Sequence, residues 1–337
     1  MKYINLGRTG LKVSRLCLGC MSFGEPNRLP QAWSIDETAA RPFFRQAIEA
    51  GINFFDTADV YGGLQWPEIP KGYGISEEII GRWLKKSGQR DKVVLATKVY
   101  QPMDFGPNDR HLSAYHIRKA CEDSLRRLKT DHIDLYQMHH IDRETPWEEI
   151  WQAMELLVQQ GKVLYIGSCN FAGWQIATAQ GLAKERHFYG LVSEQSPYNL
   201  TERTVELEVL PSCRYYGLGF IPYSPLAGGL LGGVLSKQKN GERRFGEQEL
   251  KIIEKLRYQL EKYENLAAEL KITPANLALA WLRHQPDVTA PIIGPRTETQ
   301  LDNAIEGLSI TLSDEIIHTL NDIWPGMGGE APEAYAW

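Results

Sequence analysis

The sequence has no long charge-free apolar run that could serve as a leader or a membrane span. The first ten residues, MKYINLGRTG, hold no apolar core of signal-peptide length. Between Arg214 and Lys237 there is no charge, but this stretch contains Pro222, Pro225 and six glycines. In lipid it would leave backbone groups unpaired. We interpret it as a strand followed by a glycine-rich loop, and expect no membrane insertion.

A strong charge of either sign is also missing. The formal net charge over 337 residues is -5, and no run of like charges occurs. Nucleic acid is therefore not expected as a partner. The hydrophobic fraction of 43% and the charged fraction of 23% are ordinary for a globular chain, which is long enough to bury a large core.

Cysteine is scarce, with five residues scattered along the chain. Cys17 and Cys20 form a lone C-x-x-C on an apolar strand, whereas a zinc site needs about four ligands. We interpret the cysteines as small, buried, reduced thiols and expect no metal. Reduced thiols are typical of the cytoplasm, which is the location we predict.

Apolar strand runs alternate with segments of helical periodicity along the whole chain. Strands are expected at 13–19, 53–58, 93–99, 133–139, 163–167, 191–195, 219–223 and 289–293. Helices are expected at 36–50, 76–86, from 113, 146–160, 172–186, 201–216, 247–270, from 274, 297–306 and 313–323. Asp36 and Ser76 are expected N-caps, Gly161 a C-cap, and Pro274 the first residue of its helix.

Eight strand–helix units with strict alternation imply parallel strands joined by right-handed crossovers. The glycine-rich G-x-G-x-x-G turn of an open dinucleotide-binding sheet is absent. The fold class is therefore α/β, a single-domain (β/α)8 TIM barrel over residues 1–325, with an N-terminal hairpin and extra C-terminal helices. Residues 326–337 form a tail outside the barrel pattern, which could cover the rim or mediate assembly into a homo-oligomer.

Chemically capable residues follow several strands at the rim where barrel enzymes carry their sites. Asp56, Lys98 and His139 end three strands, and Tyr61 lies just beyond the first. An ion pair of Asp56 with Lys98 would bring a cation near Tyr61, lower the pKa of its phenol and make it a general acid. A neutral His139 could donate its N–H to the same carbonyl oxygen. The alternative interpretations are that Asp56 and Lys98 form only a structural salt bridge, that Tyr61 is only an aromatic residue at the rim, and that His139 is only a hydrogen-bonded core histidine.

The sequence resembles the aldo-keto reductase family over roughly residues 3–325, closer to its bacterial and channel-β-subunit-like branch. The matching stretches are LGRTGLKVSRLCLGCMSFG, GINFFDTADVYG, VVLATK, SLRRLKTDHIDLYQMHHID, GKVLYIGSCNF, EQSPYNL, IPYSPLAGGLL and IIGPRTETQL. The resemblance implies the catalytic tetrad Asp56, Tyr61, Lys98 and His139, and hydride transfer from NADPH to an aldehyde or ketone. The family's histidine follows the last apolar residue of its strand, here Met138, which leaves His140 facing the substrate.

The resemblance also implies which residues hold NADPH/NADP+. Amide and hydroxyl side chains pin the nicotinamide, an aromatic ring stacks on it, and the 224–229 loop covers the pyrophosphate. Arg296 grips the 2′-phosphate, because a guanidinium donates two hydrogen bonds at once, and this favours NADPH. The family's usual asparagine four residues after Gln300 is replaced by Ala304. The full expected set is Gly19, Met21, Asp56, Ser168, Asn170, Gln195, Tyr223, Ser224, Leu226, Gly228, Gly294, Arg296, Gln300 and Asn303.

Two long loops, 24–35 and 62–74, are expected to set the choice of a small-molecule carbonyl substrate. We expect Trp33, Trp66 and Tyr100 to line an apolar pocket, with His140 at its edge.

Two other functions stay open. Some members of the family are NADP(H)-sensing regulatory subunits with weak turnover. A metal-dependent barrel hydrolase could use His139, His140 and Asp142, but would want further ligands such as an H-x-H on the first strand, which is absent.

Overall fold

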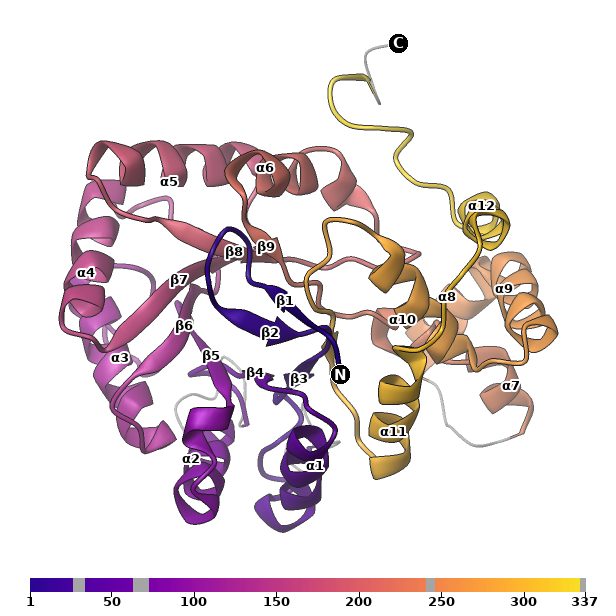
Figure 1. Cartoon of the computed structure of the whole chain (residues 1–337), viewed down its shortest axis with the longest axis horizontal. Helices are drawn as coiled ribbons and strands as arrows, with labels where there is room; N and C mark the ends of the chain where they lie inside the picture. The colour runs from indigo at the N-terminus through magenta and orange to yellow at the C-terminus, as the bar shows by residue number, and fades with distance from the viewer. Residues whose placement is uncertain (27–33, 63–72, 241–245, 334–337) are drawn as a thin grey trace.

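The computed structural model describes residues 1–26, 34–62, 73–240 and 246–333 (Figure 1). Eight parallel strands in this part of the chain form one curled sheet in the order β10-β3-β4-β5-β6-β7-β8-β9. Their bounds are β3 Cys17–Gly19, β4 Phe54–Asp56, β5 Val94–Val99, β6 Ile133–Met138, β7 Val163–Cys169, β8 Leu191–Gln195, β9 Gly219–Phe220 and β10 Ile292–Ile293.

Backbone hydrogen bonds join the two edges of this sheet. Thr289 N donates to Phe220 O at 2.8 Å, and Ile292 N donates to Pro222 O at 2.8 Å. The edges are therefore paired, and the predicted (β/α)8 barrel is confirmed.

Helices follow the strands in the predicted alternation and lie outside the sheet (Figure 1). Their bounds are α1 Glu37–Glu49, α2 Ile75–Ser87, α3 Ala114–Leu128, α4 Trp147–Gln159, α5 Gly173–Glu185, α6 Val209–Tyr216, α7 Val234–Lys239, α8 Glu247–Lys255, α9 Arg257–Glu269, α10 Pro274–His284, α11 Glu298–Gly307 and α12 Asp314–Ile323. None of the helices among the described residues is both long and apolar enough to cross a membrane.

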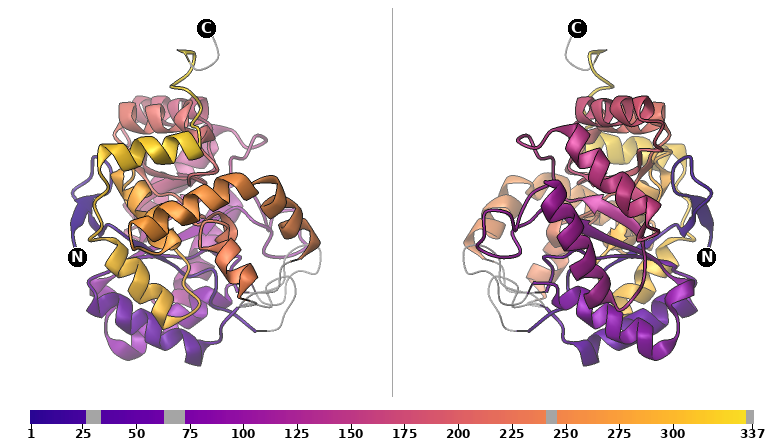
Figure 2. Two further views of the ribbon diagram at one scale, coloured as in Figure 1. Left: turned by 90° about the vertical axis from the view of Figure 1, so that its right-hand side faces the viewer. Right: turned by 90° about the vertical axis from the view of Figure 1, so that its left-hand side faces the viewer.

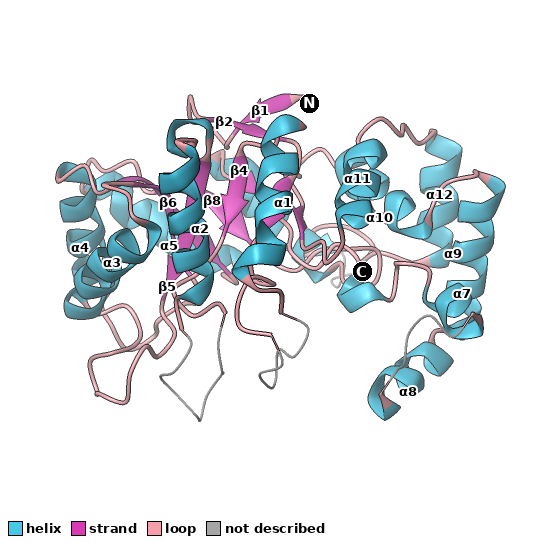
Figure 3. Cartoon of the chain, turned by 90° about the horizontal axis from the view of Figure 1, so that it is seen from below, coloured by secondary structure: helices cyan, strands magenta, loops and turns pink. Residues whose placement is uncertain are grey.

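The expected N-terminal hairpin closes one end of the barrel. Strands β1 (Tyr3–Asn5) and β2 (Lys12–Ser14) pair antiparallel. Leu6 and Val13 are fully buried in the cluster that fills the barrel. In Figure 3 the hairpin lies at one end of the strands, and α8 projects at the other end. The hairpin therefore leaves the opposite rim, where the strands end, for a site.

Several expected elements differ in extent from the sequence-based prediction. Strand 219–223 shrinks to β9 and strand 289–293 to β10, because Pro222 and Pro291 have no N–H for a ladder. The helix expected at 247–270 divides into α8 and α9 at Leu256, whose φ of -104° and ψ of 9° leave the helical region. The segment expected as a helix from 201 becomes α6 only at Val209, after a short turn.

The helix caps were predicted with mixed success. Asp36 accepts a hydrogen bond from Ala39 N at 2.9 Å, which confirms it as the N-cap of α1. Ser76 is not an N-cap: Gly74 precedes α2, and the Ser76 hydroxyl instead donates to Cys20 O at 2.8 Å. Pro274 opens α10 as expected. Gln160 caps α4, and Gly161 follows it at a φ of 71°.

The described part of the tail, drawn in yellow, rises past the outer helices and projects beyond them (Figure 2). Glu330 pairs with Arg214 on α6 at 2.7 Å, and Ala331 N donates to Leu207 O at 3.0 Å. These contacts tie the described part of the tail to the α6 region.

Candidate active site

Five side chains from five consecutive strands form one layer inside the barrel, at the end opposite the hairpin. Hydrogen bonds or close contacts join Asp56 on β4, Lys98 on β5, Gln137 on β6, Cys169 on β7 and Gln195 on β8. Alternate residues of a strand face the same side, so each strand contributes one side chain near its carboxyl end.

Asp56 is the centre of this layer. Its Oδ1 pairs with Lys98 Nζ at 2.5 Å, while its Oδ2 accepts from Gln137 Nε2 and Gln195 Nε2, both at 2.9 Å. Lys98 is fully buried, and its ammonium also donates to Thr57 O at 2.9 Å. Burial alone would lower the pKa of Lys98, but the Asp56 carboxylate raises it above its usual value. The predicted buried ion pair is confirmed, with Lys98 as a cation.

Tyr61 lies against this cation. Lys98 Nζ donates to Tyr61 Oη at 3.3 Å and lies 4.8 Å from the ring centroid. Burial nevertheless raises the pKa of Tyr61 to about 12, although Lys98 acts in the lowering direction. The predicted net lowering is therefore wrong, because desolvation of a phenolate outweighs the neighbouring charge. The phenol keeps its proton at neutral pH.

His139 follows β6, with its backbone N donating to Val99 O at 2.9 Å. Its ring meets the Tyr61 ring edge-on, with centroids 5.8 Å apart. Burial, with Lys98 and His140 adding to it, holds the pKa of His139 well below its usual value, which confirms the expected neutral imidazole. Its Nδ1 is buried and has no hydrogen-bond partner within the described part of the chain. A satisfied core histidine would not leave this nitrogen unpaired.

The structure does not bring the Ser168 hydroxyl to the site. Ser168 donates to the Glu194 carboxylate, and its hydroxyl lies 3.3 Å from Ser193 O. Cys169, the next residue, turns its thiol to Gln137 Oε1 at 3.8 Å instead. The Ser168 side chain is thus turned away from the Asp56 layer and Cys169 takes the inward position, because adjacent strand residues face opposite sides. The sequence analysis did not predict that Cys169 and Gln137 face the site. Cys169 lies two residues after Gly167 and Gln137 two residues after Leu135, and alternate residues of a strand face the same side, so the strand pattern indicates both.

Asn170 links the ends of several strands. It follows β7 with a φ of 61°, and its N donates to Gln195 O at 2.9 Å. Its Nδ2 donates to His139 O at 3.1 Å, and Tyr223 Oη donates to its Oδ1 at 2.9 Å. Three of the expected cofactor residues, Asn170, Gln195 and Tyr223, are therefore gathered beside His139.

The predicted phosphate-binding loop follows Tyr223. Ser224 has a φ of 53°, and its carbonyl accepts from Asn199 Nδ2 at 2.9 Å. Gly228 is exposed with a φ of 66°, and nothing lies within 4 Å of the position of a Cβ. Leu226 lies between them and is partly buried. Open backbone of this kind can approach an anion closely.

The residues expected to bind the adenosine end of the cofactor lie around the start of α11. Gly294 has open space around it, and the Arg296 side chain is exposed. Gln300 Oε1 accepts from Arg296 N at 2.8 Å, which shapes the turn into the helix. Asn303 is partly exposed and Ala304 is buried, so Asn303 rather than residue 304 is open to a ligand.

Two further expected cofactor residues lie after β3. A Cβ on Gly19 would come within 2.6 Å of Ile292 Cγ2, so this position has no room for a larger side chain. Met21 is 37% exposed.

Aromatic rings continue from the tetrad toward the loop after β5. His139 stacks on His140 with centroids 5.3 Å apart, and Tyr100 lies 5.4 Å from His140. His111, which the sequence did not single out, stacks on Tyr100 at 4.9 Å. Tyr100 and His140 therefore lie beside the tetrad, and their part in a substrate pocket stays a prediction. The other two expected pocket residues, Trp33 and Trp66, lie outside the described residues.

Asp142 does not join the two histidines. Its carboxylate accepts from Leu112 N at 3.0 Å and from Thr145 Oγ1 at 2.7 Å, which fastens the loop after β5. Across residues 1–26, 34–62, 73–240 and 246–333, no three His, Cys, Asp or Glu side chains form a potential metal site. Nothing in these ranges favours the metal-dependent hydrolase.

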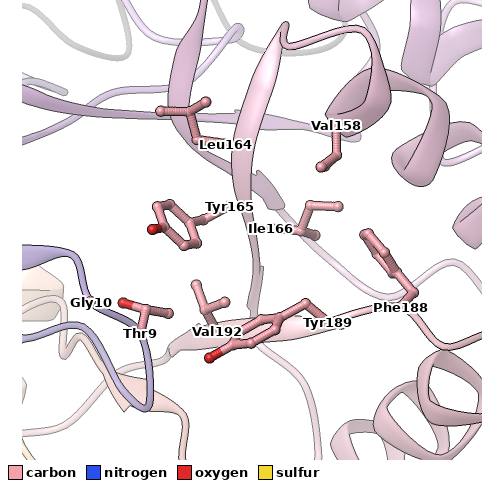
Figure 4. A pocket seen from close by; sticks show the side chains of 10 residues that line it. Thr9, Gly10, Val158, Leu164, Tyr165, Ile166, Phe188, Tyr189 and Val192 are labelled. Atoms are coloured by element: carbon pink, nitrogen blue, oxygen red, sulfur yellow. The ribbon is translucent and has the colours of Figure 1, made fainter.

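A separate cavity of about 240 Å³ lies near the start of β7 and β8. Figure 4 shows its lining, which includes Leu164, Tyr165, Phe188, Tyr189 and Val192. It contains none of the tetrad residues. The side chains that could transfer a proton lie at the other end of the barrel, at the ends of β4, β5 and β6, so the candidate site is placed there.

The rim of the barrel thus carries a buried Asp56–Lys98 pair, a protonated Tyr61 phenol and a neutral His139 imidazole. The model of the aldo/keto reductase family matches residues 15–325, and the chain belongs to this family. The protein is an oxidoreductase.

Three curated relatives cover nearly the full chain. An uncharacterized oxidoreductase, YrpG, from Bacillus subtilis (strain 168) is 55% identical over 100% of both chains. Versiconal hemiacetal acetate reductase from Aspergillus parasiticus is 34% identical over 96% of both. A probable voltage-gated potassium channel subunit beta from Oryza sativa subsp. japonica is 32% identical over 96% of both.

Proposed function

We propose that the protein reduces aldehydes or ketones to alcohols with NADPH, and that Tyr61 is the general acid. The carrying observation is the hydrogen bond from Lys98 Nζ to Tyr61 Oη. It occupies a lone pair of the phenol and leaves the phenolic proton free for a carbonyl oxygen. Such general acid catalysis is typically worth about 10²- to 10⁴-fold.

The other tetrad residues have distinct roles in this proposal. Asp56 holds Lys98 in place, and the Lys98 charge stabilises the phenolate that forms as the proton leaves Tyr61. His139 is neutral, so it can donate one N–H to the carbonyl oxygen and orient it without competing for the proton of Tyr61.

The residues beyond the tetrad fit a nicotinamide cofactor. Asn170 presents its amide beside His139, and the Gln195 amide lies next to it in the same layer of the barrel. Gly228 and Arg296 offer exposed backbone and an exposed guanidinium for phosphates. When bound, the cofactor would supply the hydride to the carbonyl carbon. We infer NADPH rather than NADH from Arg296.

The test follows NADPH oxidation at 340 nm with 4-nitrobenzaldehyde, comparing the wild type with Tyr61→Phe. The wild type should turn over, and Tyr61→Phe should lose at least about 100-fold in kcat, the lower range for a general acid, while still binding NADPH. A Tyr61→Phe variant that reduces the aldehyde at the wild-type rate would refute the assignment of Tyr61.

A second candidate is an NADP(H)-sensing regulatory subunit. It is favoured by the similarity to the proteins named as potassium channel subunits beta. Tight NADPH binding without reduction of any aldehyde, ketone or dicarbonyl in a panel would favour this function. A cytoplasmic location stays a prediction that rests on the five buried free thiols.

A further inference from the structure

Glu194, near the end of β8, has a fully buried carboxyl group without a cationic partner. Its Oε1 accepts from Phe171 N at 3.1 Å and from Ser196 Oγ at 2.7 Å, and its Oε2 contacts Ser168 Oγ. All three donors are neutral. Buried carboxylates are normally paired with a cation, but no Lys, Arg or His among the described residues pairs with this one.

This carboxyl lies directly behind the proposed nicotinamide contacts. Gln195 is the next residue along β8 and turns its amide inward, to Asp56. Phe171, whose N–H binds Glu194, is the next residue after Asn170. Glu194 therefore adjoins Gln195 along β8 and accepts a hydrogen bond from the residue that follows Asn170.

The charge of Glu194 also changes near neutral pH. Burial raises its pKa to about 7, while the hydrogen bonds from Ser168, Ser196 and Phe171 act in the lowering direction. The ionisable groups that face it from β7, α6 and the end of β9 are Cys169, Cys213 and Tyr223. Burial raises the pKa of each, so these three stay neutral.

Protonation of Glu194 need not change the geometry around it. When the carboxyl carries a proton on Oε2, the Ser168 hydroxyl can accept that proton in a hydrogen bond and donate its own to Ser193 O, 3.3 Å away. The Phe171 and Ser196 bonds to Oε1 remain in both states. The two states therefore differ mainly in charge.

An oxidised nicotinamide ring carries a positive charge that the reduced ring lacks. We propose that the buried carboxylate of Glu194 tightens the binding of NADP+ relative to NADPH and so sets the preference of the site between the two forms. This inference rests on the proposed function, because it needs a nicotinamide cofactor at Asn170 and Gln195. Glu194 acts through its charge and is not a catalytic residue.

The test measures the Kd of NADP+ and of NADPH by calorimetry at several values between about pH 6 and pH 8.5. Both forms carry the same 2′-phosphate, so its titration cancels in the ratio of the two constants. In the wild type, Kd(NADPH)/Kd(NADP+) should rise about 15-fold as Glu194 ionises, the scale of a unit charge acting over about 10 Å at an effective dielectric constant of about 20. In Glu194→Gln the ratio should stay constant with pH.

Two serine variants keep the test decisive even where Glu194→Gln fails to fold. Ser168→Ala removes a bond that favours the carboxylate, so the pH midpoint of the ratio should rise. Ser193→Ala is the control, because that buried hydroxyl has no hydrogen-bond partner among residues 1–26, 34–62, 73–240 and 246–333, and its midpoint should match the wild type.

A ratio in the wild type that does not change with pH would overturn the inference and leave the proposed function standing, as would a midpoint unmoved in Ser168→Ala. Wild type that binds neither form would overturn the proposed function, and this inference with it.

Discussion

Gln195 donates a hydrogen bond to Asp56 across the barrel, from Nε2 to Oδ2 at 2.9 Å, between residues on strands that are not neighbours in the sheet. Gln137 donates to the same oxygen at 2.9 Å. Asp56 is therefore held from three directions, with Lys98 on its other oxygen. The ion pair next to Tyr61 is preorganised, which is what a site that acts by charge stabilisation requires.

Removing one half of this buried pair should destabilise the fold strongly. Asp56→Asn leaves the fully buried Lys98 ammonium without its counter-charge, and we expect a loss of about 3–5 kcal/mol in the free energy of unfolding. The double variant Asp56→Asn/Lys98→Met removes both charges and should recover much of that loss. Urea denaturation followed by circular dichroism measures both. Equal stability of the single and double variants would show that the unpaired charge is not the cause.

The raised pKa of Tyr61 predicts how stability changes in alkali. Its folded pKa of about 12 exceeds the usual tyrosine pKa of about 10, so the contribution of Tyr61 is complete below about pH 10 and is lost as pH rises toward 12. Relative to Tyr61→Phe, the wild type should lose about 1–2 kcal/mol between pH 9 and pH 11. Denaturant titrations at these pH values provide the measurement. A difference that grows in favour of the wild type would mean that Lys98 dominates after all.

The sequence predicts the barrel and the tetrad because both depend on local order along the chain. Asp56, Lys98 and His139 each end an apolar run, and parallel strands bring their carboxyl ends to one rim. The predictions that were wrong concern features that depend on packing. The side of the sheet on which the Ser168 side chain lies changes when the register shifts by one residue. The pKa of Tyr61 depends on how deeply its phenol is buried, which no sequence motif indicates.

The bonding partners within the site could not be predicted for a related reason. Gln137 contacts Asp56 and Glu194 contacts Ser168 only once strands β4 to β8 are in register. Proline explains why β9 and β10 are short, because Pro222 and Pro291 have no N–H to donate to a neighbouring strand. This feature can be recognised from the sequence alone.

Gly81 marks a close approach of α2 to α3. A Cβ at this position would lie 2.3 Å from Arg127 O and 2.5 Å from Leu128 C, both backbone atoms. Gly81→Ala should therefore force the helices apart and cost about 1–3 kcal/mol. Gly181→Ala is the matched control within α5, where a Cβ meets nothing within 4 Å, and should stabilise slightly. Thermal unfolding of the two variants checks this, and a smaller loss for Gly81 than for Gly181 would contradict the geometry.

Arg296 should decide between the two nicotinamide cofactors. Its exposed guanidinium follows Gly294 at the start of α11, where a 2′-phosphate would gain charge-assisted hydrogen bonds worth about 1.5–3 kcal/mol. Arg296→Ala should therefore weaken NADPH binding about 10- to 100-fold and leave NADH binding nearly unchanged. Arg186→Ala, which removes another arginine paired with Glu155 on the outer helices, should alter neither. Fluorescence titration of both cofactors distinguishes the variants. An equal loss for NADPH and NADH in Arg296→Ala would mean that this arginine holds the fold of the turn rather than the phosphate.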